Sequence, residues 1–224
     1  MSRLITIDGL DGSGKATQTR MLCAELERRG VNVRSVSFPN YKEPSSAPVK
    51  MYLNGDFGKK PGDVNAYAAS SFFAVDRYAS YVRHWREDYK NGILIVADRY
   101  TTSNMIYQLS KLPKSDWDGF ITWLCDFEYK KLGLPEPNLT LYLDVEPEIS
   151  QKLLSKRYNG DNNKKDIHES NVGYLSICRE SAAYAARRLG WKVIRCTSSG
   201  KLLDAESIHL EITKIILGEL NLND

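Results

Sequence analysis

The stretch LITIDGLDGSGKATQ, residues 4–18, decides how this chain folds. Its first four residues are apolar or β-branched, as in a buried strand, and the glycines that follow let the backbone turn with its N–H groups facing inward. Lys15 then opens a helical pattern, and the N-terminus of a helix carries partial positive charge that favours anions. A strand, a glycine-rich loop and a helix that begins with lysine together predict a phosphate-binding cradle.

The loop is nearly a Walker A motif, in which the lysine reaches the β- and γ-phosphates of a nucleotide. Ala16 stands where that motif has Ser or Thr to hold Mg²⁺, so we expect the metal to use Asp11 and Asp98 together with Thr17, phosphate oxygens and water. A plain glycine turn between strand and helix is the alternative interpretation. The residues expected to contact ATP are Gly9, Asp11, Gly12, Ser13, Gly14, Lys15, Ala16 and Thr17.

Strand and helix patterns alternate along the rest of the chain. Apolar, β-rich runs occupy residues 4–7, 31–38, 93–97, 139–145 and 191–196. The 3.6-residue period of amphipathic helices appears at residues 15–29, 65–89, 117–131, 148–158, 171–189 and 203–217. This alternation predicts an α/β fold, with a parallel sheet covered by helices on both faces and ligands at the carboxyl ends of the strands.

The composition excludes several classes of partner. The net charge of +3 comes without a long basic run, so a nucleic-acid polymer is not expected. We expect no membrane segment, no signal peptide and no metal-binding cysteine pattern, and therefore a cytoplasmic protein of one domain, residues 1–224. The basic stretch 156–165 also holds Asn, Gly and Asp, so it predicts either a mobile lid, at about residues 156–169, or a solvated turn.

Asp98 and Arg99 follow the most apolar run, residues 93–97, which predicts a central strand. At its end Asp98 can orient Mg²⁺ or its water, and Arg99 can clamp a phosphate with its planar fork. An exposed Asp–Arg pair is the alternative.

Several motifs, taken together and in order, resemble the thymidylate kinase family over nearly the whole chain. They are the loop 9–17, the Phe38-Pro39 pair, FAVDRY at 73–78, DRY at 98–100 with Ser103, Asn104 and Tyr107, and GLPEP at 133–137. The resemblance implies the nucleoside monophosphate kinase fold, with a five-stranded parallel sheet, a lid and usually a homodimer. It also implies transfer of the γ-phosphoryl group of ATP to dTMP, with Mg²⁺, for dTTP synthesis.

A pyrimidine pocket also makes chemical sense from spacing alone. Phe73 and Arg77 are four residues apart on a predicted helix and so share one face, where Phe73 can stack on a base and Arg77 can donate to a ring carbonyl. A core position is the alternative for Phe73. By resemblance, Ser103 and Asn104 address the polar edge of thymine, and Tyr107 lies where a ribose 2′-hydroxyl would clash. A helix with small polar surface residues is the alternative for this second group.

The resemblance places the acceptor phosphate beside Phe38 and Pro39, where Tyr41 and Arg99 are its expected ligands and Lys42 or Lys50 are further candidates. Because the loop 9–17 has no arginine, the catalytic cation is expected from the lid: Arg157, with Lys164 and Lys165 as rivals. Glu169 matches an acidic lid residue that helps arrange the metal, or is a helix N-cap. His168 is expected to be a surface residue of the lid rather than a catalytic base.

Two rival functions remain open at this stage. One is a kinase for another monophosphate such as dUMP, dCMP or UMP, because a thymine methyl group is worth only about 1–3 kcal/mol of discrimination. The other is a P-loop switch or ATP-binding regulatory module, which would need no second nucleotide pocket. Adenine contacts are expected near residues 197–201.

Overall fold

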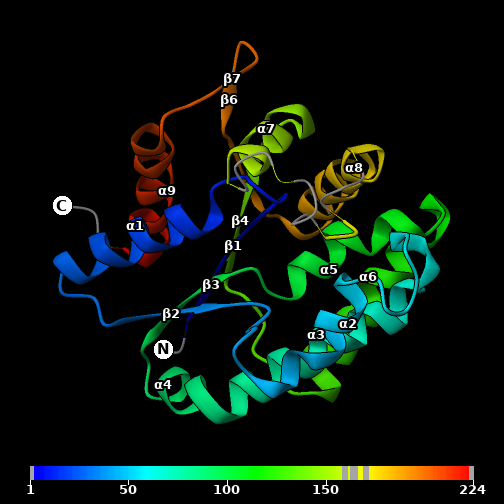
Figure 1. Ribbon diagram of the computed structural model, residues 1–224. Coiled ribbons are helices and arrows are strands. Elements are labelled where there is room, and N and C mark those ends of the chain that lie inside the picture. The colour runs from blue at the N-terminus through cyan, green and yellow to red at the C-terminus, as the bar shows by residue number, and fades with distance from the viewer. Residues whose placement is uncertain (1–2, 158–160, 162–165, 169–171, 222–224) are drawn as a thin grey trace.

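The structure, a computed structural model, describes residues 3–157, 161, 166–168 and 172–221 (Figure 1). At its centre lies a five-stranded parallel sheet with the order β2-β3-β1-β4-β5. The strands are β1 (Leu4–Gly9), β2 (Val33–Ser37), β3 (Leu94–Asp98), β4 (Leu139–Asp144) and β5 (Lys192–Arg195). The predicted α/β fold, a five-stranded parallel sheet flanked by helices, is therefore confirmed.

Helices connect the strands, and two of the long predicted helices contain a change of winding. Residues 65–89 form α3, the π-helical turn Tyr81–Trp85 and α4, while residues 117–131 form α6 and the π-helical turn Asp126–Lys131. Short 3₁₀ turns lie at Pro44–Ser46, Pro61–Asp63, Leu109–Lys111 and Lys114–Asp116. The α-helices are α1 (Lys15–Arg28), α2 (Ala47–Leu53), α3 (Ala66–Ser80), α4 (Arg86–Lys90), α5 (Thr101–Tyr107), α6 (Trp117–Cys125), α7 (Pro147–Arg157), α8 (Val172–Leu189) and α9 (Ala205–Leu220).

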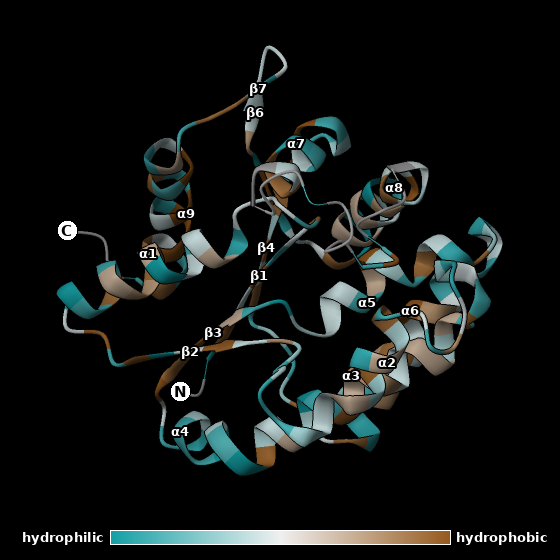
Figure 2. Ribbon diagram, viewed as in Figure 1, coloured by the Kyte–Doolittle hydropathy of each residue, from teal (hydrophilic) through white to brown (hydrophobic). Residues whose placement is uncertain are grey.

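The helices form a layer on each face of the sheet because side chains of a strand alternate between its faces. Ile5 of β1 packs in one apolar cluster with Leu22 of α1 and Ile212 of α9. Leu4, one residue earlier, belongs to a cluster on the opposite face with Trp85. Figure 1 shows α1 and α9 on one side of the sheet and α3, α5 and α8 on the other, and Figure 2 shows the hydrophobic strands enclosed between them.

The ends of three strands meet at one edge and place the loops that follow them side by side. Ile7 of β1 and Ser37 of β2 are both in register with Asp98 of β3. Backbone hydrogen bonds continue past the strands, from Phe38 N to Asp98 O at 3.0 Å and from Arg99 N to Ile7 O at 3.0 Å. The three segments predicted to carry the site therefore adjoin one another.

Two elements were not predicted. Helix α2 is seven residues long and begins next to Pro44 and Pro48, so its apolar period is too short to recognise. The hairpin of β6 (Thr197–Ser198) and β7 (Lys201–Leu202) has two residues in each strand, too few for a visible alternation. Among the described residues, no helix combines the length and the apolar character needed to cross a membrane.

Candidate active site

The loop between β1 and α1 adopts the turn that its glycines predict. Gly12 and Gly14 have φ angles of 79° and 89°, in the left-handed region that side chains with a Cβ rarely occupy. A Cβ on Gly12 would also stand 2.9 Å from the carbonyl oxygen of Ser150. Gly14 is the N-cap of α1, so the loop leads its N–H groups to the positive end of that helix. This geometry is suited to an anion.

Lys15, the first residue of α1, is buried beneath this loop. Its Nζ donates to the carbonyl oxygens of Gly9 at 3.0 Å and Leu10 at 2.7 Å. Burial, with help from the positive charge of Arg99, lowers the pKa of Lys15 to about 8. The lysine therefore keeps its proton at neutral pH, and it loses that proton as the pH rises through 8.

Arg99 lies at the end of β3 and is held from several sides. Its backbone has a φ of 66°, and strained backbone of this kind concentrates at functional sites. The guanidinium pairs with one carboxylate oxygen of Asp11 and lies 5.6 Å from the ring centre of Tyr107. The Tyr107 hydroxyl donates to the other Asp11 oxygen at 2.7 Å. Asp11 thus fixes the positions of both side chains.

Asp11 and Arg99 are both charged at neutral pH. Burial opposes ionisation of Asp11, but the positive charges of Arg99 and Lys15 outweigh it and lower the pKa of Asp11 to about 2. Burial also disfavours the charge of Arg99, yet Asp11 raises the pKa of Arg99 well above its usual value.

The predicted metal ligands have different surroundings. Asp98 lines the same cavity as Lys15 and Ala16, and burial raises the pKa of its carboxyl. Both oxygens of Asp11 already accept from Arg99 and Tyr107. Within the described part of the chain, no three His, Cys, Asp or Glu residues gather to hold an ion. The residues present fit Mg²⁺ that arrives bound to nucleotide phosphates, and Asp98, a carboxylate of the cavity lining, would hold it.

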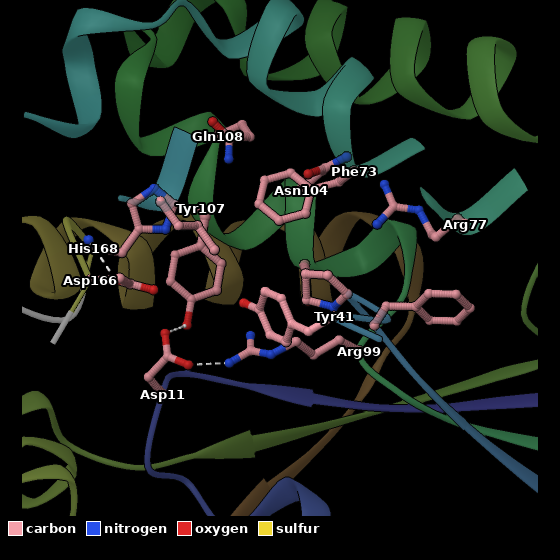
Figure 3. Close-up of a pocket in the computed structure, with 14 residues that line it drawn as sticks. Asp11, Tyr41, Phe73, Arg77, Arg99, Asn104, Tyr107, Gln108, Asp166 and His168 are labelled. Atoms are coloured by element: carbon pink, nitrogen blue, oxygen red, sulfur yellow. Dashed lines mark hydrogen bonds and ion pairs between the residues drawn. The ribbon is translucent and has the colours of Figure 1, made fainter. Parts of the chain in front are cut away.

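A first cavity gathers the side chains predicted for the acceptor, except the further candidates Lys42 and Lys50 (Figure 3). They come from α3, from α5 and its preceding turn, and from the segment after β2, where the Phe38–Pro39 peptide bond is cis. Leu53, Gln108, Asp166 and His168 line it as well and were not predicted as ligands. The predicted residues that line it are Phe38, Pro39, Tyr41, Phe73, Arg77, Arg99, Ser103, Asn104 and Tyr107.

A carboxylate that sequence reasoning missed lies behind this cavity. Glu128 accepts hydrogen bonds from Arg77 Nε and Nη2, both at 2.6 Å, and from the Asn104 amide nitrogen at 3.2 Å. Burial opposes the charge of Arg77, but Glu128 raises the pKa of Arg77 above its usual value. Ser103 also differs from expectation in its contacts, because its hydroxyl donates to Asp8 at 2.8 Å. Glu128 lies 51 residues from Arg77 in the chain, in a π-helical turn, and no motif points to it.

The prediction that His168 lies on the surface is wrong. Its side chain is 4% exposed, its Nε2 is 2.7 Å from the Tyr52 hydroxyl, and its ring stacks on Tyr107. Burial and the nearby charge of Lys111 lower the pKa of His168 to about 3, so the ring is neutral. Polar neighbours in the sequence suggested exposure, but the aromatic rings of the site enclose this residue. Lys164, Lys165, Glu169 and the side chain of Arg157 lie outside the described residues.

A second cavity, of about 1150 Å³, lies over the glycine loop and is large enough for a nucleotide. Leu202, Leu203, Ala205 and Ile208 line its far end, next to the segment predicted to contact adenine. Lys50 lines this cavity, whereas Lys42 is not among the described residues that line either cavity. The two cavities share lining residues at their junction, and those residues are Asp11, Phe38, Pro39, Tyr41, Leu53, Arg99 and Asp166.

Comparison with known proteins gives a consistent result. The sequence model of the thymidylate kinase family matches residues 7–206. A thymidylate kinase of Mycobacterium tuberculosis is 30% identical over 185 residues, which cover 81% of this chain and 84% of the relative. A thymidylate kinase of Ruegeria pomeroyi is 26% identical, with 97% and 95% covered. A probable thymidylate kinase of Methanosarcina barkeri is 28% identical, with 99% and 98% covered. The chain belongs to the thymidylate kinase family.

Proposed function

We propose that this protein transfers the γ-phosphoryl group of ATP to dTMP, giving ADP and dTDP for dTTP synthesis. The observation that carries the proposal is the position of Arg99, which lines both cavities at their junction. A donor phosphate over Lys15 and an acceptor phosphate beside Tyr41 would both be within the region that Arg99 faces. A P-loop switch needs the cavity over the glycine loop but not the first cavity, so the acceptor pocket favours a kinase.

On the donor side, the inward N–H groups of the loop and the N-terminus of α1 bind the phosphates, and Lys15 exchanges its carbonyl partners for phosphate oxygens. Mg²⁺ bound with ATP supplies further positive charge to the β- and γ-oxygens. Asp98 would be the residue that holds this metal. Ala16 offers no hydroxyl, so the loop itself contributes no side-chain ligand at that position.

On the acceptor side, Phe73 stacks on the pyrimidine while Arg77 donates to a ring carbonyl. The Asn104 amide nitrogen is already used by Ser70 O and Glu128, which leaves its oxygen to accept from a ring N–H. Tyr107, held by Asp11, stands beside the sugar and leaves no room for a 2′-hydroxyl. Tyr41 and Arg99 bind the phosphate.

The chemistry then needs positioning more than covalent help. The ionised acceptor phosphate already carries its nucleophilic oxygen, so no general base is required. His168, which is neutral, has no role as a base in this reaction. Arg99 and Lys15 stabilise the charge that spreads over the transferred oxygens. Asp11 contributes by fixing the Arg99 guanidinium rather than by touching substrate. We assign the lid to residues 156–169, with Arg157 as its cation and Glu169 near the metal.

Selectivity among monophosphates tests the proposal. With ATP and Mg²⁺, we expect ADP release to be fastest with dTMP, slower with dUMP, and lower by about two orders of magnitude with UMP, because a steric clash excludes the 2′-hydroxyl. A coupled assay of ADP release across dTMP, dUMP, dCMP and UMP measures this. Equal turnover of UMP and dTMP would contradict the role of Tyr107, and titration calorimetry without dTMP binding would support the switch instead.

We also propose that the protein forms a homodimer through an apolar stripe on α3, made of Tyr67, Val75 and Tyr78, and the adjoining end of α6. Tyr67, Val75 and Tyr78 are 42%, 53% and 44% exposed and recur at helical spacing on one face of α3. The ring centre of Tyr67 lies 4.7 Å from that of Trp123 on α6. Apolar residues gathered on one face are typical of protein interfaces.

Substitution of Val75 should therefore dissociate the dimer. We expect V75E to sediment as a monomer at a concentration where the native protein is a dimer, because a charge would be buried in the interface. The matched control is Leu210→Glu, which places the same charge on a large hydrophobic residue of α9 that is 68% exposed, more than any other among the described residues. A native protein that sediments as a monomer, or a dimer that persists in Val75→Glu, would contradict this interface.

A further inference from the structure

Glu128 is a fully buried carboxylate behind the acceptor cavity, in the π-helical turn Asp126–Lys131. It is not among the described residues that line the cavity, so it reaches a ligand only through other side chains. Turns of this kind inside α-helices are frequent at functional sites. The contacts of Glu128 indicate the function of the turn Asp126–Lys131.

Four hydrogen bonds converge on the two oxygens of Glu128, and every one of these partners is a donor. Oε2 accepts from Arg77 Nε at 2.6 Å and from the Thr101 hydroxyl at 2.8 Å. Oε1 accepts from Arg77 Nη2 at 2.6 Å and from Asn104 Nδ2 at 3.2 Å. A carboxylate has about four acceptor positions, so its capacity is filled. Arg77 of α3 and Asn104 of α5 are thereby tied to the same oxygen.

These contacts fix which way the Asn104 amide points. Its nitrogen lies between two acceptors, Glu128 Oε1 and the Ser70 carbonyl oxygen at 3.3 Å. Rotation of the amide by half a turn would set its oxygen against both acceptors, which is unfavourable in a buried site. The Asn104 oxygen is therefore the group offered to the cavity.

The orientation of Arg77 is fixed in the same way. Its Nε and Nη2 bind Glu128, and its Nη1 donates to the Tyr100 carbonyl at 3.3 Å. One N–H on each terminal nitrogen is left by these bonds. The wall of the cavity thus presents a donor from Arg77 next to an acceptor from Asn104 (Figure 3).

This order of donor and acceptor matches one class of pyrimidine. A 4-oxopyrimidine carries a carbonyl acceptor next to a ring N–H donor, whereas a 4-aminopyrimidine carries an amino donor next to a ring nitrogen acceptor. We propose that Glu128 is a positioning residue that fixes the donor–acceptor order of Arg77 and Asn104, and so makes the site select 4-oxopyrimidine over 4-aminopyrimidine monophosphates. The inference rests on the proposed function and adds a residue to it.

A purely structural ion pair between α3 and the π-helical turn Asp126–Lys131 would explain the bonds from Arg77 to Glu128. It would not explain the bonds from Asn104 and Thr101 to the same carboxylate. Loss of Glu128 should have different effects if it is a structural partner or a positioning residue. A structural pair affects stability and all substrates alike, because it has no preference for one base. A positioning residue changes the ratio between bases.

The test is the substitution Glu128→Gln, assayed with dTMP and dCMP. A glutamine amide has only one acceptor atom, so it cannot satisfy four donors, and the Asn104 amide is then held mainly by the Ser70 carbonyl oxygen and turns more easily. We expect the ratio of kcat/KM for dTMP over dCMP to fall about tenfold or more, mainly through KM for dTMP, while KM for ATP changes little. The matched control is Asp126→Asn, the same loss of charge at a partly exposed position of the same turn, which should leave the ratio unchanged.

Thr101→Val is a second, milder variant that keeps the Arg77–Glu128 pair and removes one donor. It should lower the same ratio by about threefold, in keeping with one hydrogen bond, and it carries the test if Glu128→Gln does not fold. An unchanged ratio in an active, folded variant would overturn the role of Glu128, as would equal losses for both nucleotides and for ATP. A native protein inactive with dTMP would overturn the proposed function itself and this inference with it.

Discussion

Replacing Arg99 by alanine is expected to lower kcat with dTMP by about two orders of magnitude or more, as loss of a preorganised charge typically does. Arg99 is fixed by its contact with Asp11, and among the described residues it is the one Lys or Arg that lines both cavities. Steady-state kinetics with ATP and dTMP measures the effect. Arg99→Lys should restore only part of the rate, because an ammonium group cannot bind two oxygens in the manner of a guanidinium.

A matched control separates catalysis from stability. Arg179 forms a comparable pair with Asp144 at the end of β4, at 2.7 Å, and is not among the described residues that line the two cavities. Arg179→Ala should keep kcat within about twofold, as surface ion pairs contribute little. Near-normal turnover in Arg99→Ala, or an equal loss in both variants, would refute the role given to Arg99.

Replacing Lys15 by methionine is expected to lower kcat/KM for ATP by about two orders of magnitude or more, because its buried ammonium is the charge that exchanges the Gly9 and Leu10 carbonyl oxygens for phosphate oxygens when ATP binds. The pH dependence follows from the same group. Burial lowers the pKa of Lys15 to about 8, so kcat/KM for ATP in the native enzyme should decline as pH rises through 8 and the proton is lost.

Lys111 provides the control for this prediction. It is a second lysine whose pKa burial lowers, to about 7, but it binds Tyr52 and Val64 O and is absent from the described linings of both cavities. Lys111→Met should leave the affinity for ATP, measured by calorimetry, close to that of the native protein. An equal loss of ATP affinity in both variants, or an intact affinity in Lys15→Met, would contradict the assignment.

Much of the fold and of the site is visible in the sequence because both depend on local periodicity. The runs at residues 4–7 and 93–97, which form most of β1 and β3, are apolar or β-branched, as is typical of central parallel strands, and their carboxyl ends lie at the same edge of the sheet. Phe73 and Arg77 share a face of α3 because helical spacing is fixed, and the same holds for Ser103 and Tyr107 on α5. Features that depend on strand and helix periodicity can therefore be predicted from the sequence.

Residues joined only by tertiary contacts were not predictable in this way. Glu128 reaches Arg77 from a π-helical turn 51 residues away, and its neighbours in the sequence carry no sign of that pairing. His168 stands among polar residues in the sequence but packs on Tyr107, because the chain returns over the site at this point. The roles of Arg157 and Glu169 remain predictions, since those side chains lie outside the described residues.

The most direct measurement is a crystal structure of the protein with dTMP and a non-hydrolysable ATP analogue bound together. The predicted result places the thymine ring between Phe73 and Arg77, its phosphate on Arg99, and the γ-phosphate of the analogue beside Lys15. Thymidine monophosphate bound at any other place, with Arg99 contacting neither nucleotide, would contradict the meeting of the two pockets at this residue.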